Sequence, residues 1–421
     1  MSRAERHLLL AVSLCVALVS SPWAAASGNG NGKPLVTAIT KDAATSLYTV
    51  PIKDGHPLVL DLAGALIWTS CAAAHPTLEC HHHFCMHAHS YHPPGCPHNG
   101  YGRADVEDPF RCKCTAHPYN PFSGESATAD LTRTRLSANA TDGKNPLYPV
   151  SFTAVTSCAP DSLLAKLPAG AVGVAGLART RLALQAQVAR SQKVANKFAL
   201  CLPSGGGGGG VAIFGGGPLF LLPPGRPDVT ATLAGETPLH RNKDLPGYFI
   251  SAIKIAVNQE QVQLYTQEPL VVELSSRIPY TALRPDVYRA VIDAFDRATA
   301  GRKRVTPAVA PFELCYDSRE LGSTRLGYAV PQIDLVLEGG KNWTVFGGNS
   351  MAQVNDDTAC LAVVKMKGEK GNPPPPAAVI GGFQMENNLV VFDEEKQRVG
   401  FSGLLWGRQT TCSNFNFTLA A

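Results

Sequence analysis

One stretch of the sequence concentrates side chains that can bind metal ions. Residues 80–100 read CHHHFCMHAHSYHPPGCPHNG, and nine of the twelve histidines of the chain lie between His75 and His117. Imidazole nitrogens and cysteine thiolates are the usual ligands of Zn²⁺, and they also suit copper and nickel. The cysteine spacings here, C-x4-C, C-x10-C and C-x-C, lack the paired C-x2-C pattern of closed zinc sites. The stretch is therefore either a metal site or a histidine-rich loop.

A second pattern places polar turns after two apolar strands. The first region, PLVLDLAGALIW (57–68), has Asp61 at the end of a strand, followed by a turn of small residues. The second region, LVVELSSRIPYTALRPDVYRAVIDAF (270–295), is an apolar strand, a polar turn and a helix. Two carboxylates that share one water can act as general base and general acid. The two regions look like distorted copies of one motif, so the question is whether both copies supply a carboxylate.

The elements that must position these residues are mostly strands. Segments rich in β-branched and aromatic residues, bounded by Gly, Pro and Asp, predict strands at 48–52, 57–62, 66–70, 211–214, 248–257, 270–275, 343–347 and 389–393. Helical patterns occupy residues 182–195 and 284–298, the second with Pro285 near its start. GGGGGG (205–210) is followed by a strand rather than a helix, so we interpret it as a hairpin connection. We expect a mainly β protein with a few short helices.

The N-terminus has the layout of a secretory signal peptide. Arg3 and Arg6 precede the apolar run LLLAVSLCVALV, and small residues follow up to Ala26. We expect residues 1–26 to be removed and the mature protein to be secreted. No later stretch approaches the roughly twenty apolar residues of a membrane-spanning helix, so no membrane segment is predicted.

Size and composition limit the function classes. About 395 mature residues exceed the usual size of one core, which favours two lobes. The formal net charge is only +4 and neither sign clusters, so nucleic acid is not an expected partner.

Eleven of the 12 cysteines follow the signal peptide, and in a secreted chain most should form disulfides with at least one left over. The sequons at Asn139, Asn342 and Asn416 predict N-glycosylation.

Several motifs in a consistent order carry a family resemblance. They are TKDAATSLYTVPI (40–52), LVLDLAGALIWTSC (58–71), TAHPYNPFSG (115–124), GVAGLARTRLALQAQVA (173–189), VAIFGGGP (211–218), SSRIPYTALRPDVYRAVIDAF (275–295), CYD (315–317), GYAVP (327–331) and VIGGFQMENNLVVFDEEKQRVGFS (379–402). With these motifs the chain resembles the plant pepsin-like aspartic proteases, and more closely the xylanase inhibitors of the cereal TAXI type. The resemblance runs from about Lys33 to Cys412. It implies the pepsin-like acid protease fold, with two β-barrel-like lobes at 34–235 and 245–412.

The resemblance also implies that the proteolytic dyad is lost. Active members supply one Asp-Thr/Ser-Gly loop from each lobe. Asp61 occupies the first aspartate position, but the second falls on Ser275, whose hydroxyl cannot share a titrating proton with a carboxylate. Glu273 lies two residues earlier on the same face, displaced by roughly 6–7 Å, too far to replace the missing acid. We therefore expect an inactive homologue of aspartic endopeptidases rather than an enzyme.

Both neighbouring loops depart from the family pattern as well. Asp61 is followed by Leu62-Ala63-Gly64 in place of Thr-Gly-Ser, which removes a hydroxyl and shifts the glycine. Tyr119 corresponds to the flap tyrosine, and the glycine after it has become Asn120.

Two loops correspond to the inhibitory contacts of TAXI-type proteins. In the loop LGSTRLGY (321–328), Arg325 stands where inhibitors present a leucine, and Leu326 is next to it. In the loop LLWGRQTTC (404–412), Trp406 and Arg408 stand near the position of the inhibitory histidine. An arginine can engage carboxylates of a target enzyme, and a tryptophan can mimic sugar stacking in a glycan cleft.

The resemblance implies a secreted inhibitor of microbial endo-1,4-β-xylanase or of another glycoside hydrolase, acting in plant defence in the apoplast or cell wall. A wall or seed-storage globulin-like binding protein of the same fold is the alternative. A residual aspartic endopeptidase is a third reading, which Ser275 disfavours. We expect a monomer without a cofactor.

The cysteine pattern follows from the same resemblance. It implies the pairs Cys71–Cys158, Cys201–Cys412 and Cys315–Cys360. The pairing among Cys80, Cys85, Cys96, Cys112 and Cys114 stays open, since sequence alone does not fix connectivity. This segment corresponds to a disulfide-stapled loop of the family, and sulfurs in disulfides are not thiolate ligands. We therefore interpret residues 80–100 as a loop with incidental metal affinity and predict no functional metal.

Overall fold

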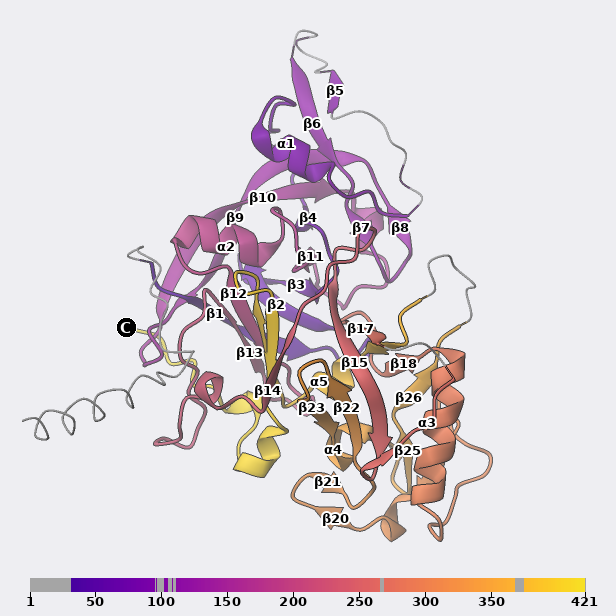
Figure 1. The fold of residues 1–421 in the computed structure, drawn as a ribbon. Coiled ribbons are helices and arrows are strands. Elements are labelled where there is room, and N and C mark those ends of the chain that lie inside the picture. Colours follow the sequence, from indigo (N-terminus) through magenta and orange to yellow (C-terminus); the bar gives the residue numbers. More distant parts are fainter. Residues whose placement is uncertain are drawn as a thin grey trace, which may run out of the picture.

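The computed structural model describes residues 32–94, 96, 102–104, 108, 111–265, 269–367 and 375–420 (Figure 1). The predicted signal peptide lies outside these residues. The fold is pepsin-like and mainly β, as the resemblance implied. Figure 1 shows the indigo to magenta part of the chain above and the orange part below it, with the β5–β6 hairpin and α1 projecting at the top.

Fourteen strands form the largest sheet, which curls around the core of the first lobe. In spatial order they are β14 (Gly235–Pro238), β29 (Arg398–Phe401), β28 (Leu389–Asp393), β12 (Lys197–Cys201), β13 (Gly210–Phe214), β1 (Leu35–Lys41), β2 (Tyr48–Lys53), β3 (His56–Asp61), β11 (Gly173–Gly176), β4 (Trp68–Ser70), β10 (Tyr148–Ala159), β9 (Ala129–Ala140), β6 (Cys112–Ala116) and β5 (Gly102–Ala104). The hexaglycine run connects the antiparallel pair β12 and β13, as predicted. Two strands from late in the chain, β28 and β29, join this sheet, so the division into sheets does not follow the predicted sequence boundary.

The second lobe is built on an eight-stranded sheet. Its strands are β23 (Asn342–Val345), β22 (Ile333–Leu337), β15 (Tyr248–Val257), β17 (Leu270–Leu274), β27 (Ala378–Ile380), β18 (Thr281–Leu283) and β26 (Val363–Lys365), with β16 (Glu260–Gln261) paired to β15. Smaller sheets join β19 (Cys315–Asp317), β25 (Thr358–Leu361) and β24 (Met351–Asn355), β20 (Ser323–Thr324) with β21 (Gly327–Tyr328), and β7 (Tyr119–Asn120) with β8 (Glu125–Ser126).

Helices are short and lie at the edges of the sheets. The α-helices are α1 (His83–Ala88), α2 (Leu184–Gln192), α3 (Pro285–Ala298), α4 (Gly347–Ser350) and α5 (Gly382–Met385), and the 3₁₀ helices are η1 (Asp161–Leu164), η2 (Val229–Thr232), η3 (Ser318–Glu320), η4 (Leu405–Arg408) and η5 (Cys412–Asn414). α3 begins at Pro285 and buries Val287, Val291 and Phe295 against the second lobe. The 3.6-residue period of its apolar positions predicted this face.

Aromatic side chains join the cores of the two lobes. Phe198 of β12 pairs in register with Phe392 of β28, and their rings stack with centroids 4.6 Å apart. Tyr248, the first residue of β15, packs against Phe392 at 4.5 Å and donates a hydrogen bond to the carbonyl oxygen of Leu177 at 2.7 Å. Aromatic contacts of this kind add to the free energy gained from burial. The lobes therefore share one packed interior at their junction.

Among the described residues, ten cysteines form five disulfides. Cys71–Cys158, Cys201–Cys412 and Cys315–Cys360 are the pairs that the resemblance implied. Cys80–Cys112 and Cys85–Cys114 resolve the pairing that the sequence left open, and Cys96 takes part in none of the five.

The histidine-rich stretch is not only a loop, because α1 forms within it. The ring of His82 accepts a hydrogen bond from the backbone N–H of Phe84 at 3.3 Å, which caps the helix. Cys85 and Ala88, three residues apart, are buried, and the Cys85–Cys114 disulfide fastens the helix to β6. The interpretation of residues 80–100 as a loop was therefore wrong for this part, since cap and disulfide together stabilise one helical segment.

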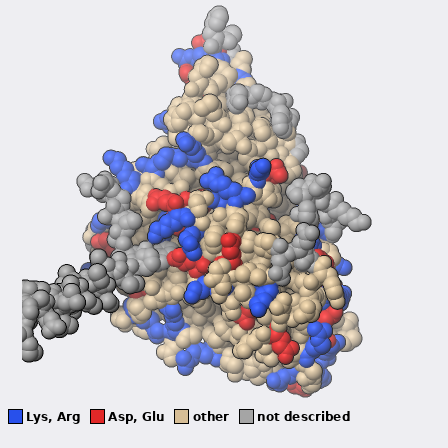
Figure 2. Space-filling model, in the orientation of Figure 1, with Lys and Arg blue, Asp and Glu red and all other residues tan. Residues whose placement is uncertain are grey.

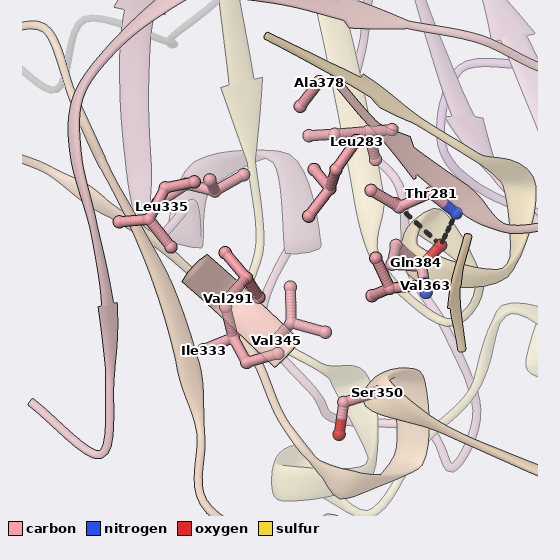
Figure 3. Close-up of a pocket in the computed structure, with 12 residues that line it drawn as sticks. Thr281, Leu283, Val291, Ile333, Leu335, Val345, Ser350, Val363, Ala378 and Gln384 are labelled. Carbon is pink, nitrogen blue, oxygen red and sulfur yellow. Dashed lines mark hydrogen bonds between the residues drawn. The ribbon is translucent and has the colours of Figure 1, made fainter. Parts of the chain in front are cut away.

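A small cavity lies inside the second lobe (Figure 3). Its volume is about 40 Å³, and aliphatic side chains such as Leu283 and Val363 surround it. Both the backbone N–H and the hydroxyl of Thr281 donate to the side-chain oxygen of Gln384, at 2.8 and 2.9 Å, whereas the buried hydroxyl of Ser350 makes no hydrogen bond within the described part of the chain. Its lining is mostly aliphatic and contains no charged side chain, so we interpret this cavity as a packing feature.

Charges of both signs are interspersed on the face of the molecule in Figure 2. That face offers no large patch of one sign, in keeping with the small net charge of the chain. Among the described residues, no helix has the length and apolar character needed to cross a bilayer.

Candidate functional site

The carboxylate of Asp61 lies at the junction of the two lobes and is paired with an arginine. Asp61 ends β3 and is 1% exposed. Arg277 donates from Nε to Oδ1 at 2.7 Å and from Nη2 to Oδ2 at 2.9 Å. The backbone N–H of Ala63 also donates to Oδ1, at 3.0 Å. Bidentate contacts of this kind are among the strongest hydrogen bonds between side chains.

The second position of the protease dyad holds a serine in a buried place. Ser275 is 3% exposed, and its Oγ accepts a hydrogen bond from the backbone N–H of Arg277 at 3.2 Å. Ser276 joins the two lobes, since its hydroxyl donates to the carbonyl oxygen of Leu60 at 2.8 Å and accepts from the N–H of Leu62 at 3.1 Å. The hydrogen bonding between the loops is thus retained while one carboxylate is missing. An aspartic-protease mechanism, which needs both, has no second acid at this position.

The glycine of the drifted first loop is required by close packing. A Cβ added to Gly64 would lie 2.8 Å from the Cα of Gly176 and 2.9 Å from Oδ2 of Asp61. Any side chain at residue 64 would therefore push the turn away from the Asp61 carboxylate. The glycine has shifted along the sequence, and its function of allowing close approach is kept.

A second carboxylic acid, Glu273, lies near this pair. The pKa of Glu273 is raised above its usual range, mainly because the side chain is buried. The positive charge of Arg277 opposes this shift, and the negative charge of Asp61 adds to it. Gly247 lies between Glu273 and the turn after Asp61, since a Cβ added to it would lie 3.6 Å from Oε1 of Glu273 and 3.4 Å from the Cβ of Ala63. Two carboxyl groups and one guanidinium thus interact electrostatically at the lobe junction, one carboxyl in an ion pair and the other with a raised pKa.

A small cleft, with a volume of about 20 Å³, lies beside this group. Its lining is Asp61, Ala63, Gly64, Ala65, Leu66, Trp68, Tyr91, His117, Tyr119, Val174 and Arg277. Its two tyrosines, Tyr91 and Tyr119, are half-buried. Tyr119 belongs to the β7–β8 hairpin, which is the predicted flap. The indole N–H of Trp68, in β4, donates to the carbonyl oxygen of Tyr119 at 3.1 Å and thereby holds the flap against β4.

Asn120 replaces the flap glycine and has its own structural function. It is fully buried, and its Nδ2 donates to the carbonyl oxygens of Leu163 and Ala165, both at 2.8 Å. Its Oδ1 accepts from the N–H groups of Phe122 and Ser123, at 2.8 and 3.2 Å. The base of the flap is thus fixed to the segment around η1.

The two predicted inhibitory loops lie side by side on the second lobe. A Cβ added to Gly407 would lie 3.3 Å from Cδ2 of Leu326, and one added to Gly348 would lie 2.5 Å from the ring of Trp406. Arg325 is exposed at the tip of the β20–β21 hairpin, and Leu326 and Trp406 are half-buried. An aliphatic, an aromatic and a cationic side chain thus gather from two loops.

Arg408 is exposed but is engaged within the chain. Its Nη2 donates to the carbonyl oxygen of Thr232 at 2.7 Å, and its Nη1 contacts the Thr232 hydroxyl. The side chain of Arg226 donates in turn to the carbonyl oxygen of Arg408. The arginine therefore fastens the C-terminal loop to η2, which the sequence alone did not reveal.

Sequence analysis did not identify two buried charge pairs, of which the first lies at the site. One is Arg277 with Asp61, although the replacement of a glycine by arginine in the second loop was a signal that could have indicated it. The other is Glu386, which accepts from Lys41 Nζ and from the Tyr48 hydroxyl, both at 2.6 Å. These partners are more than 300 residues apart in sequence, so no local pattern predicts them.

The comparisons with known proteins agree with this geometry. A pepsin-like scaffold with one dyad aspartate defines the class of aspartic-protease homologues that lack the proteolytic pair. Within that class, residues 48–216 match the family model described as xylanase inhibitor N-terminal, and residues 247–403 match xylanase inhibitor C-terminal. The chain therefore belongs to the xylanase inhibitor family of the aspartic protease fold.

Individual relatives bear different functional names. The chain is 93% identical to "Chitinase CLP" of Oryza sativa subsp. japonica, with 99% of both chains covered. It is 33% identical to "Probable aspartic proteinase GIP2" of Nicotiana benthamiana, with 98% of this chain and 99% of the relative covered. The crystal structure of edgp superposes with a TM-score of 0.80 at 34% identity, covering 93% of this chain and 99% of the other. The crystal structure of basic 7S globulin from soybean superposes with a TM-score of 0.74 at 27% identity, covering 92% of this chain and 100% of the other.

Proposed function

We propose that this chain hydrolyses chitin, the polymer of β-1,4-linked N-acetylglucosamine, at the cleft that Asp61 lines, with Glu273 as the second carboxyl group of the lobe junction. The observation that carries the proposal is the 93% identity, over 99% of both chains, to a protein named as a chitinase. Differences at so few positions leave the fold and the arrangement of the cleft in common. Proteolysis is not part of the proposal, because Ser275 replaces the second dyad acid.

The chemistry of glycoside hydrolysis fits the two carboxyl groups. Most glycosidases need one carboxylic acid that donates a proton to the leaving oxygen and one carboxylate on the other side of the bond. The raised pKa of Glu273 suits the acid. Asp61 suits the carboxylate, because Arg277 holds its two oxygens in one orientation and matches its charge.

The walls of the cleft suit a sugar. The exposed parts of the rings of Tyr91 and Tyr119 can stack on the apolar face of a pyranose, as aromatic side chains do in glycan sites. Tyr119 of the β7–β8 hairpin lines the cleft, whose volume is about 20 Å³, so the hairpin would have to open for a sugar to enter. The β7–β8 hairpin would close on the substrate and limit the access of water.

The compartment is part of the proposal. Five disulfides are typical of proteins outside the cytosol. We propose a secreted, glycosylated monomer of the plant apoplast or cell wall that acts in defence. Of its sequons, Asn342 is exposed at the start of β23, whereas Asn139 and Asn416 are half-buried.

The experiment is a hydrolysis assay with N-acetylglucosamine hexamer and colloidal chitin at mildly acidic pH. Wild type should release shorter oligosaccharides, and both Asp61→Asn and Glu273→Gln should reduce the rate by at least about 100-fold. Glu260→Gln, an exposed glutamate in the same lobe, is the matched control and should keep full activity. Equal rates for Glu273→Gln and wild type would refute the assignment of the acid.

A second candidate function is inhibition of microbial xylanase or another glycoside hydrolase, without catalysis. The contact of Leu326 with the Trp406 loop favours it, since two loops that correspond to inhibitory loops form one surface. Aromatic and arginine side chains dominate binding energy in protein interfaces. Endo-xylanases titrated with this protein should lose activity, and Trp406→Ala should weaken the inhibition by at least about tenfold. Unchanged inhibition by Trp406→Ala and Arg325→Ala would rule out this surface. If neither activity exists, a globulin-like binding function remains.

A further inference from the structure

We propose that His92, Cys96 and His117 bind one zinc ion in the wall of the cleft. The ligand atoms of these three residues all lie within 4.8 Å of one another. Two imidazole nitrogens and one thiolate are a zinc ligand set, and with three protein ligands the fourth coordination position takes a water or another small ligand. The site departs from the sequence-based expectation of no metal, because its ligands come from two segments joined by folding.

Three imidazole rings gather at this place. His92 and His117 have ring centroids 5.4 Å apart, and His89 lies 5.9 Å from His92 and 5.4 Å from His117. His117 is only 3% exposed, so at least one of the rings lies inside the protein rather than on its surface. Burying the imidazole of His117 is costly, and a metal ion bound to one of its nitrogens would offset the cost.

The surrounding structure holds the ligands in place. The Cys85–Cys114 disulfide joins α1 to β6. Cys85 lies seven residues before His92, and Cys114 lies three residues before His117. His89 is fixed by a contact of 2.8 Å between its Nε2 and the carbonyl oxygen of Thr115. The hydroxyl of Thr128 lies 3.5 Å from Nδ1 of His117, so Nε2 is the ring nitrogen that would take the metal. Such outer contacts orient metal-binding imidazoles and fix their tautomer.

Cys96 supplies the donor that distinguishes this cluster from the exposed histidines around it. It takes part in none of the five disulfides. Cys85 and Cys114 also lie near His89, but their sulfurs are joined to each other and are not thiolate donors. When zinc binds, a zinc–sulfur bond forms, the S–H bond of Cys96 breaks and the proton passes to solvent.

The position of the cluster connects it with the cleft. His117 is both a proposed ligand and part of the cleft lining, together with Tyr91 and Asp61. A zinc ion here would place a positive charge in the same wall and fix the segment that carries Tyr91. The proposal does not depend on the hydrolysis of chitin, because zinc binding is measured directly.

The experiment uses the full secreted protein, freed of metal with a chelator and then titrated with ZnCl₂ against a chromophoric competitor. Wild type should bind one zinc per chain tightly, and Cys96→Ser should weaken this event by at least about tenfold. His81→Ala, which removes an exposed histidine from the same stretch, is the matched control and should leave it unchanged.

Substitution with Co²⁺ gives a second readout that does not depend on affinity. Thiolate-to-cobalt charge-transfer absorption should appear in wild type and in His81→Ala and should be absent in Cys96→Ser. Thermal unfolding of the metal-free variants checks that each is folded. Equal zinc affinity of wild type and Cys96→Ser, or absorption that lacks the thiolate band, would overturn the proposal and leave weak binding by exposed histidines only.

Discussion

Arg277 places its guanidinium against both carboxylate oxygens of Asp61, at 2.7 and 2.9 Å, and thereby joins the turn after β17 to the end of β3. In the protease pattern that the sequence resembles, a glycine stands at the position of Arg277. The replacement fills the junction with a matched charge. The loop that lacks the second acid at Ser275 thus also supplies the arginine that pairs with Asp61.

Removing this arginine should destabilise the protein strongly. Arg277→Ala leaves the carboxylate of Asp61, which is 1% exposed, without its counter-charge. Breaking a buried pair from one side costs about 3 kcal/mol or more of unfolding free energy. Urea unfolding followed by tryptophan fluorescence measures the loss. The double variant Arg277→Ala with Asp61→Asn should recover part of it, and an equal loss in both variants would show that the ion pair is not the cause.

Glu273 should make stability depend on pH in a defined direction. Its pKa in the folded protein is raised above the usual 4.5, so the ionised form is disfavoured by folding. The free-energy cost of ionising Glu273 in the folded protein is present in full above its folded pKa. This cost disappears as the pH falls below the usual pKa of 4.5. Glu273→Gln should therefore stabilise the protein at pH 7, with an advantage that shrinks towards pH 4. Denaturant unfolding at both pH values, with Glu260→Gln as the exposed control, tests the sign. A gain that grows on acidification would contradict it.

The Cys201–Cys412 disulfide should contribute strongly to stability, since it closes a sequence separation of 211 residues. Cross-links over long loops restrict the unfolded chain, and their removal typically costs about 2–5 kcal/mol. The double substitution of Cys201 and Cys412 by serine should lower the midpoint of thermal unfolding. Replacing the Cys80–Cys112 pair, which spans a separation of 32, should cost less. The reverse order would indicate that strain or local packing dominates.

Asn120 should be needed for the flap to keep its place. Its side chain makes four hydrogen bonds to backbone groups, so Asn120→Ala leaves buried donors and acceptors unsatisfied. Each such group costs roughly 1–3 kcal/mol. Hydrogen exchange should rise in the β7–β8 hairpin and around η1 while the second lobe stays protected. Uniform protection in the variant would mean that other contacts hold the flap.

The sequence predicted the scaffold because its motifs and periods are local. The β-branched and aromatic composition of 270–275 and 389–393 indicated β17 and β28, and the 3.6-residue period of 284–298 indicated α3, without any knowledge of the fold. The pairing of Arg277 with Asp61 and of Glu386 with Lys41 was not predicted, because each joins segments that only folding brings together. The same holds for the cluster of His92 and His117, whose ligands have no spacing that matches a known zinc motif.

The most direct test of the central claim is the release of oligosaccharides from N-acetylglucosamine hexamer by the secreted wild-type protein and by Glu273→Gln. We predict hydrolysis by wild type at mildly acidic pH, loss of at least about 100-fold in Glu273→Gln, and full activity in Trp406→Ala. Absence of hydrolysis by wild type, with xylanase inhibition that Trp406→Ala abolishes, would contradict the claim and assign the protein to the inhibitors.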